Sequence, residues 1–288
     1  MKYRIFLVPL VLFGFFSSFA GAVGSQKGMF FDSETESIVR IFVNCSYSIL
    51  LKFPQNKEIK IGVTQMGNGF FAGEHKGEDE LIVTASHILW CNSTVGDLEK
   101  NGIFHDYQKN SKENISLENI IGLKDSKISS ILGYTFDGGG LQNIQVIYIS
   151  PGPHKTDEPD RALLKARVDA SIPHTHISLM DDKVFEEIFY KDGIKKSVYV
   201  RGFLNFLGNW FVRYKDAKIE WVGESTFQIN EHLDKGLSGS PVLFNNNGTL
   251  YALGVVSSTP LEETGRFYNW SWIAITKKSF LDAKQKKK

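Results

Sequence analysis

A serine between two glycines stands directly before a short apolar run in the C-terminal part of the chain. Residues 236–241 read G-L-S-G-S-P, and the apolar letters V-L-F follow. Glycine permits the tight backbone angles of such a turn and lets other groups approach closely. A nucleophilic serine needs this exposure, together with backbone N–H groups aimed at a developing oxyanion. Ordinary turns at strand entries share the pattern, so residues elsewhere must decide whether Ser238 is reactive.

Two partners for Ser238 stand upstream. His87 follows an apolar run and two small residues, and Asp160 precedes another apolar run. A neutral histidine can take the proton of a serine hydroxyl, and a carboxylate can hold the histidine in the right tautomer and stabilise the imidazolium. Asp157 competes with Asp160 as this acid, and we prefer Asp160 because it directly abuts the apolar run.

In these residues the chain resembles the chymotrypsin-like (trypsin-fold) serine proteases, of the bacterial secreted type. The resemblance covers roughly residues 36–276. Three blocks carry it: T-A-S-H at 84–87 resembles T-A-A-H, D-R-A-L-L at 160–164 resembles D-x-A-L-L, and residues 236–241 resemble G-D-S-G-G-P. Two flanking blocks add to it: G-N-G-F-F at 67–71, and G-V-V-S at 254–257, similar to the strand that borders the substrate cleft.

The resemblance implies an all-β fold of two six-stranded antiparallel β-barrels, with the active site in the cleft between them. It implies that His87 is the base, Asp160 the residue that orients it and Ser238 the nucleophile. The backbone N–H groups of Gly236 and Ser238 would form the oxyanion hole. The implied activity is peptide-bond hydrolysis through an acyl-enzyme, without a metal or organic cofactor. A triad esterase and a protease-fold binding module with a latent site are the alternatives.

Leu237 departs from the family pattern. The family usually has an acidic or amide residue before the nucleophile, and in its zymogens that acid pairs with a newly cut N-terminus. Leucine cannot form this pair, so we expect no activation by that route. Two alternatives stay open: Leu237 packs inward and orders the oxyanion loop by another contact, or the loop needs a partner or substrate to order it. Ser240 replaces the second glycine, a mild change.

The resemblance also locates a substrate cleft. Its lining would include His232, Ser257, Ser258 and Thr259. Thr259 stands where trypsin-like enzymes usually keep a glycine, so it would narrow the pocket entrance. We find no acid in this stretch that would select Arg or Lys, and we expect a preference for small or medium apolar residues.

The N-terminus has the features of an export signal. Lys2 and Arg4 precede an apolar stretch at 5–16, and A-G-A at 20–22 is typical of a cleavage site. We therefore expect residues 1–22 to be a signal peptide and the protein to be secreted or periplasmic, without stable membrane contact after cleavage. An uncleaved anchor is the alternative.

The mature chain would contain two cysteines, Cys45 and Cys91. In an exported protein two cysteines usually pair, and a bond at Cys91 would brace the loop that carries His87. Two buried thiols are the alternative. We expect no metal site, because His174 and His176 have no third or fourth ligand near them in the sequence with a useful spacing.

Composition limits the classes of partner. A net charge of +1 on 288 residues implies no nucleic-acid partner, so we expect a protein or peptide substrate. The oligomeric state is left open by the sequence.

Short β-type runs separated by turns suggest barrels or sandwiches. We expect a first barrel within 23–172, a second within 173–276 and a short helix with a basic tail at 277–288. Residues 97–126 are polar and weakly patterned, which predicts a long loop. The expected strands are 38–43, 48–53, 59–63, 69–71, 81–84, 144–149, 162–168, 197–202, 210–215, 219–222, 225–229, 242–244, 250–256 and 270–275.

Overall fold

The computed structural model divides the chain into two compact units, residues 1–32 and residues 33–288. Everything described below belongs to the second unit. The structure describes residues 33–52, 57–73, 79–111, 115, 117–151, 158–192, 195–206, 209–258 and 270–285. The predicted signal peptide at 1–22, Asp157 and Thr259 therefore lie outside the described residues.

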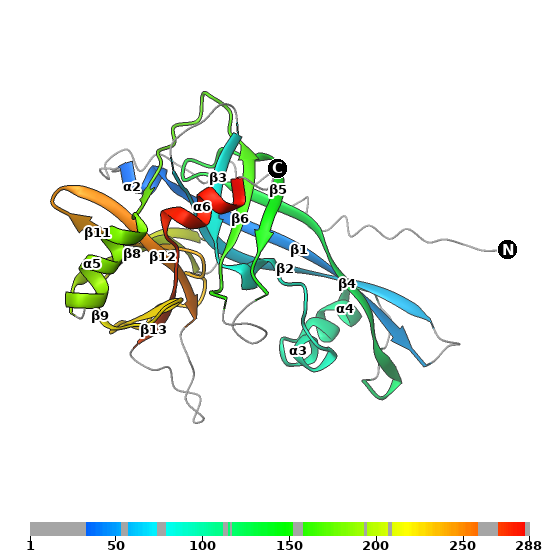
Figure 1. The fold of residues 1–288 in the computed structure, drawn as a ribbon. Helices are drawn as coiled ribbons and strands as arrows, with labels where there is room; N and C mark the ends of the chain where they lie inside the picture. Colours follow the sequence, from blue (N-terminus) through cyan, green and yellow to red (C-terminus); the bar gives the residue numbers. More distant parts are fainter. Residues whose placement is uncertain are drawn as a thin grey trace. The chain divides into compact units, whose positions relative to one another are not determined.

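The first sheet has six antiparallel strands in the order β4-β1-β2-β3-β6-β5 (Figure 1). A bridge between Tyr134 and Gly140 brings its two ends together, so the barrel is nearly closed. Its strands are β1 (Ile38–Leu51), β2 (Glu58–Phe71), β3 (Asp79–Thr84), β4 (Ile120–Tyr134), β5 (Gln142–Ile149) and β6 (Ala162–Arg167).

The second sheet is a closed six-stranded antiparallel barrel with one added strand. Its order is β11-β8-β9-β10-β13-β12, closed by the pairing of β11 with β12, and β7 adds to β12 in parallel. Its strands are β7 (Ser178–Leu179), β8 (Ser197–Phe206), β9 (Asn209–Val222), β10 (Thr226–Ile229), β11 (Pro241–Asn246), β12 (Thr249–Ser258) and β13 (Ser271–Ile275). The two-barrel all-β fold predicted from the sequence is confirmed.

Short helices connect these strands. They are α2 (Ser33–Glu36), η1 (Ser86–Leu89), α3 (Val95–Lys100), α4 (Ile103–Ser111), η2 (Leu117–Asn119), α5 (Asp182–Asp192) and α6 (Lys278–Gln285). In the described part of the chain, none of the helices has the length and apolar character needed to cross a membrane.

The core of the first barrel is formed by side chains that point inward at every second position of its strands. Along β1, buried residues alternate with half-buried ones from Val39 onward, which is the period of two that a strand imposes on its side chains. Phe70 and Phe71 at the end of β2 are fully buried. Residues that face inward on β3 and β6 fill the same core. These strands deliver the loops that contain His87 and Asp160.

Several predicted elements are longer in the structure or of another type. The expected strands 38–43 and 48–53 form one strand, β1, because polar residues between them continue the alternation rather than break it.

The prediction of a long loop over 97–126 is wrong. Helices α3 and α4 occupy much of it, and β4 begins at Ile120. Thr94 starts α3 with a capping box, in which its side chain and that of Asp97 each accept from the other's backbone N–H.

A disulfide joins Cys45 on β1 to Cys91, just after η1, with their Cα atoms 5.4 Å apart. The predicted pairing is therefore confirmed. Because η1 contains His87, the bond ties the histidine turn to the centre of the first sheet.

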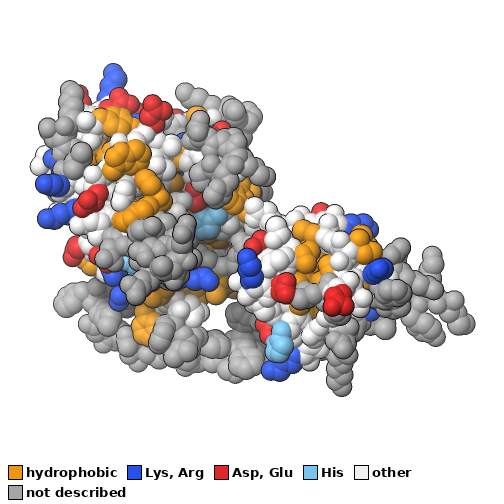
Figure 2. All heavy atoms as spheres, turned by 90° about the horizontal axis from the view of Figure 1, so that it is seen from below, with side chains coloured by type: hydrophobic (Ala, Val, Ile, Leu, Met, Phe, Trp, Pro, Cys, Tyr) orange, Lys and Arg blue, Asp and Glu red, His pale blue; other side chains and the backbone are white. Residues whose placement is uncertain are grey.

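The surface is mixed in charge. On the face drawn in Figure 2, Lys and Arg side chains are interspersed with Asp and Glu, and hydrophobic side chains show in small groups between them. Several of the exposed aromatic residues, Phe211, Tyr214 and Trp221, belong to β9.

Removing the disulfide should lower the free energy of unfolding. The bond joins residues with a sequence separation of 46. Closing a loop of this length removes conformational entropy from the unfolded chain and raises its free energy by about 4 kcal/mol. We expect Cys45→Ala/Cys91→Ala to be less stable by about that amount in urea unfolding. Adding reductant should destabilise the wild type but leave the double variant unchanged. Equal stability of the two proteins under oxidising conditions would contradict this account.

Candidate active site

The histidine turn begins where β3 ends. Strand β3 pairs with β2 on one side and β6 on the other, so it is held at the centre of the first sheet. After Thr84, the buried residues Ala85 and Ser86 let the chain turn tightly into η1. The side chain of His87 is 33% exposed, so one edge of its ring remains accessible.

The carboxylate of Asp160 accepts hydrogen bonds at both oxygens. Oδ2 lies 2.6 Å from Nδ1 of His87 and accepts from the Ser257 hydroxyl at 2.7 Å. Oδ1 accepts from the Ser86 hydroxyl at 2.6 Å and from the backbone N–H of His87 at 2.9 Å. These contacts follow from the sheet register, because Thr84 pairs with Ala162 and brings the start of β6 beside the end of β3. The structure thus brings His87 and Asp160 together.

The surroundings of Asp160 keep it ionised. Burial by itself raises the pKa of this carboxyl. The hydrogen bond and charge of His87, with the hydroxyls of Ser86 and Ser257, outweigh burial and lower the pKa from 3.8 to about 2. A carboxylate held in this way fixes Nδ1 of His87 as the protonated nitrogen and leaves Nε2 as the basic one.

The serine turn lies between β10 and β11. Gly236 and Gly239 have positive φ angles of 107° and 80°, a conformation that glycine adopts without strain. The turn is hydrogen-bonded to β12, because Gly239 N–H donates to Val256 O at 2.8 Å and Val256 N–H donates to Ser240 O at 2.9 Å. A Cβ at Gly239 would lie 2.0 Å from the backbone oxygen of Asn68, so only glycine fits there.

Ser238 sits at the tip of this turn and is half-buried. Its carbonyl accepts from the backbone N–H of Asn68 on β2 at 2.8 Å, which joins the turn to the first sheet. Neither Gly236 nor Ser238 donates its backbone N–H to any described residue. Whether these two groups stabilise an oxyanion stays a prediction of the sequence.

His87 and Ser238 are not hydrogen-bonded to each other among the described residues; the His87 ring pairs with Asp160 at Nδ1. In enzymes without substrate, hydrogen bonds between such groups are often long and tighten on binding. The structure therefore contains a histidine oriented by Asp160 and a half-buried Ser238, and a hydrogen bond between the two side chains stays a prediction.

Leu237 packs inward. It is fully buried and belongs to the core of the second barrel, together with residues such as Val200 and Val242. A Cβ at Gly202 would lie 3.0 Å from Cδ2 of Leu237, which shows how closely β8 passes the leucine. Of the two alternatives left open by the sequence, the structure contains the one in which Leu237 anchors the turn through an apolar contact.

Asn68 is a site residue that sequence reasoning missed. Its side chain is fully buried, and its amide donates to Gly236 O at 2.8 Å and to Phe203 O at 3.1 Å while accepting from Phe203 N–H at 2.8 Å. The side chain thus connects the residue two before Ser238 to strand β8. The signal was a polar residue within the apolar end of a strand, at 67–71, where an amide needs partners.

Ser86 and Ser257 were noticed for other reasons. The sequence marks Ser86 only as one of two small residues before His87, and Ser257 as part of the expected substrate cleft. In the structure both hydroxyls donate to Asp160. Both serines lie in sequence blocks that were singled out for the resemblance, but only the fold shows that both donate to Asp160.

The expected pocket residues have different surroundings. Ser258 is exposed at the end of β12, and His232 is half-buried in the loop after β10. That loop is held by Ser271, whose hydroxyl donates to Glu231 O and accepts from Leu233 N–H. Thr259 lies outside the described residues, so the expected narrowing of the pocket stays a prediction.

A separate group of possible metal ligands consists of Glu80, His174 and His176. The sequence reasoning expected no metal here, because it found no third ligand near the two histidines. The structure supplies one from β3, 94 residues before His174.

Comparison with known proteins adds little beyond the fold. No family model matches this chain, and no curated protein matches it. A thermostable serine protease, AL20, from an extremophilic microorganism is among the solved structures that match. Its identity is 10% and its TM-score 0.47, over 88% of this chain and 96% of that chain. At this identity and TM-score, the likeness says nothing about activity.

The lowered pKa of Asp160 predicts a pH-dependent contribution to stability. A carboxyl whose pKa falls on folding stabilises the native state above its unfolded pKa, here 3.8, and this contribution is lost as the pH falls toward about 2. We expect the stability difference between the wild type and Asp160→Asn to shrink by about 2 kcal/mol between about pH 5 and about pH 2. Urea unfolding of both proteins across this range measures the difference. A difference that stays constant with pH would show that Asp160 titrates normally in the folded protein.

Proposed function

We propose that this chain is a serine endopeptidase that hydrolyses peptide bonds with Ser238 as nucleophile, His87 as general base and Asp160 as its orienting acid. One observation carries the proposal: the Asp160 carboxylate holds Nδ1 of His87 at 2.6 Å, in a two-barrel fold whose serine turn leaves the N–H groups of Gly236 and Ser238 unused among the described residues. Binding alone requires no such combination.

In the proposed reaction, the Ser238 hydroxyl attacks the carbonyl carbon of the scissile peptide bond. His87 takes the hydroxyl proton at Nε2 as the new C–O bond forms, and the carbonyl oxygen becomes negative. The N–H groups of Gly236 and Ser238 donate to that oxygen. His87 then passes the proton to the leaving amine, and the C–N bond breaks to give the acyl-enzyme. A water molecule, deprotonated by His87, hydrolyses the ester and restores Ser238.

Asp160 serves this cycle without changing its own charge. Its pKa of about 2 keeps it negative wherever a neutral histidine exists. The negative charge stabilises the imidazolium that forms in each step. Because four donors hold the carboxylate, its orientation is set before substrate binds.

The proposed chemistry implies a protein or peptide substrate. We propose a small or medium apolar residue before the scissile bond, because the stretch expected to line the pocket offers no acid that would select Arg or Lys. We propose that the protein acts outside the cytoplasm, with residues 1–22 as a removed signal peptide. The disulfide between Cys45 and Cys91 supports this location, because such bonds persist in oxidising compartments. We further propose that residues 23–172 and 173–276 are the two barrel domains, with 277–288 as a tail.

Labelling with a fluorophosphonate probe tests the nucleophile. We expect one adduct on Ser238 of the wild type and none on Ser238→Ala or His87→Ala. Ser130→Ala, an exposed serine on β4, is the matched control and should label like the wild type. Peptide turnover should fall by about 10⁶ in Ser238→Ala, the scale known for such nucleophiles. Unchanged turnover in that variant refutes the assignment.

A folded wild type that resists labelling would point to the alternative, a protease-fold binding module. The missing hydrogen bond between His87 and Ser238 is the observation that favours it. Hydrolysis of small esters but of no peptide would instead support a triad esterase.

Replacing Asn68 tests how the turn is positioned. Asn68→Ala removes the donor to Gly236 O, so the peptide unit after Gly236 loses a contact that holds it. The adjoining peptide unit, which contains the N–H of Gly236, is then positioned less firmly. We expect kcat to fall by about 10²–10³, the cost of losing one oxyanion donor, with KM changed less than threefold, roughly. Circular dichroism and urea unfolding show whether the variant is folded at the assay temperature. A folded Asn68→Ala with wild-type kcat would exclude a positioning role.

A further inference from the structure

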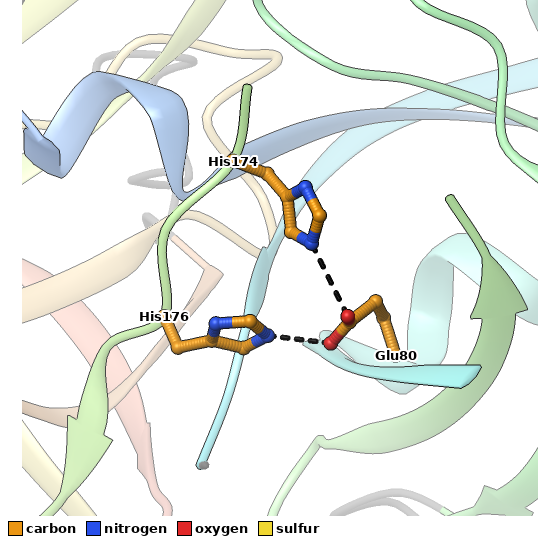
Figure 3. Close-up of side chains that lie close together, drawn as sticks. All are labelled: Glu80, His174 and His176. Carbon is orange, nitrogen blue, oxygen red and sulfur yellow. Dashed lines mark hydrogen bonds and ion pairs between the residues drawn. The ribbon is translucent and has the colours of Figure 1, made fainter. Parts of the chain in front are cut away.

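We propose that Glu80, His174 and His176 bind a divalent transition-metal ion, best matched by zinc, at a site separate from Ser238. The three side chains converge (Figure 3): Nε2 of His174 lies 3.2 Å from one carboxylate oxygen of Glu80, and Nε2 of His176 lies 2.5 Å from the other. One ligand atom from each residue lies within 4.8 Å of the other two.

These separations suit a tetrahedral ion. Zinc binds imidazole nitrogen and carboxylate oxygen at about 2.0–2.2 Å, which places neighbouring ligand atoms about 3.4 Å apart. The two observed contacts, 3.2 and 2.5 Å, are shorter than this spacing, so the three donors would move apart slightly to admit one ion between them. Two imidazoles with one carboxylate form a donor set typical of zinc, and three protein ligands leave the fourth position to water.

The tautomer of His174 favours a cation between the rings and Glu80. Nδ1 of His174 lies 2.9 Å from the backbone oxygen of Ile172. A carbonyl only accepts, so Nδ1 carries the hydrogen in this contact. Nε2, which faces the Glu80 carboxylate, is then the nitrogen that would bind the ion. A backbone carbonyl on the second ring nitrogen is also the usual support of a metal-binding histidine.

The local structure holds the donors in place. His174 and His176 are alternate residues of an extended segment, so both rings face the same side. The ring of Phe71 packs against both, with centroids 5.1 and 6.0 Å away. The side chain of Glu80 is 4% exposed, and those of the histidines are 15% and 17% exposed. The attraction between the Glu80 carboxylate and a cation is stronger in such a buried setting than at the surface.

The site would join two parts of the fold. Glu80 belongs to β3, and the histidines belong to the segment that leads into β7 of the second sheet. The next residue, Ile177, already bridges Ala72 in parallel and donates to Phe71 O at 2.9 Å. An ion here adds a second link beside that bridge. The Oγ1 atom of Thr84 at the end of β3 would lie 2.5 Å from a Cβ at Gly239 in the serine turn. Glu80 lies about 13 Å before Thr84 along the strand, so the ion would act on stability rather than on Ser238.

Zinc chloride is the probe for the test. The full chain, purified without a histidine tag, with its disulfide intact and after treatment with EDTA, is titrated by calorimetry and its metal content measured by mass spectrometry. We expect one zinc per chain and a higher unfolding temperature with zinc than with EDTA. Calcium should produce neither effect, because it prefers sites made only of oxygen.

Variants identify the ligands. We expect His176→Ala and Glu80→Gln to weaken zinc binding by at least about 100-fold, since even outer partners of a metal site contribute 10–100-fold. His105→Ala, on α4 with 80% of its side chain exposed, is the control and should bind like the wild type. Glu80→Gln keeps the size of the side chain, so it remains informative if His176→Ala fails to fold.

Two results would overturn the proposal. One is a folded wild type that binds no zinc, which would make the cluster a hydrogen-bonded group only. The other is wild-type zinc affinity in a folded Glu80→Gln or His176→Ala, which would place the ion elsewhere. Zinc binding and the unfolding temperature are measured without peptide hydrolysis. Either outcome for the metal site therefore leaves the proposed role of Ser238 unaffected.

Discussion

The buried carboxylate of Asp160 accepts hydrogen bonds from both sheets. The donors from the first sheet are the Ser86 hydroxyl and two groups of His87, and the donor from the second is the Ser257 hydroxyl on β12. Because each oxygen has two donors, rotation of the carboxylate would break several bonds at once. The direction of the His87 ring, and with it the identity of its basic nitrogen, depends on this arrangement.

Asn68 makes a second set of contacts between the sheets. Its side chain holds Gly236 and β8, and its backbone N–H holds the carbonyl of Ser238. Each of these buried hydrogen-bonding groups, if left without its partner, would lower the stability of the fold by about 1–3 kcal/mol. Leu237 completes the arrangement with an apolar contact in the second core. The serine turn is thus held by a buried amide and a buried leucine.

Errors in predicting the strands have a common cause. The expected strands 38–43 and 48–53 leave out the residues between them, yet Asn44 and Ser46 occupy the half-buried face of β1 while Cys45 and Tyr47 fill the core. A strand with one face toward water tolerates polar residues at every second position. Where β1 pairs with β4, the register shift after Asn44 leaves an extra residue on β4, which interrupts the alternation of that strand and not of β1. Helix α3 carried a readable start signal at Thr94 that went unused.

Local sequence by itself determined the features that depend on adjacent residues: the glycine-flanked turn around Ser238, the small residues before His87, and the two cysteines. Tertiary structure decided which distant residues meet. It brought Ser257 to Asp160, and it brought Glu80 to His174 across 94 residues. The reason is that such contacts depend on strand register and on how each sheet closes, and a pattern of alternating side chains specifies neither.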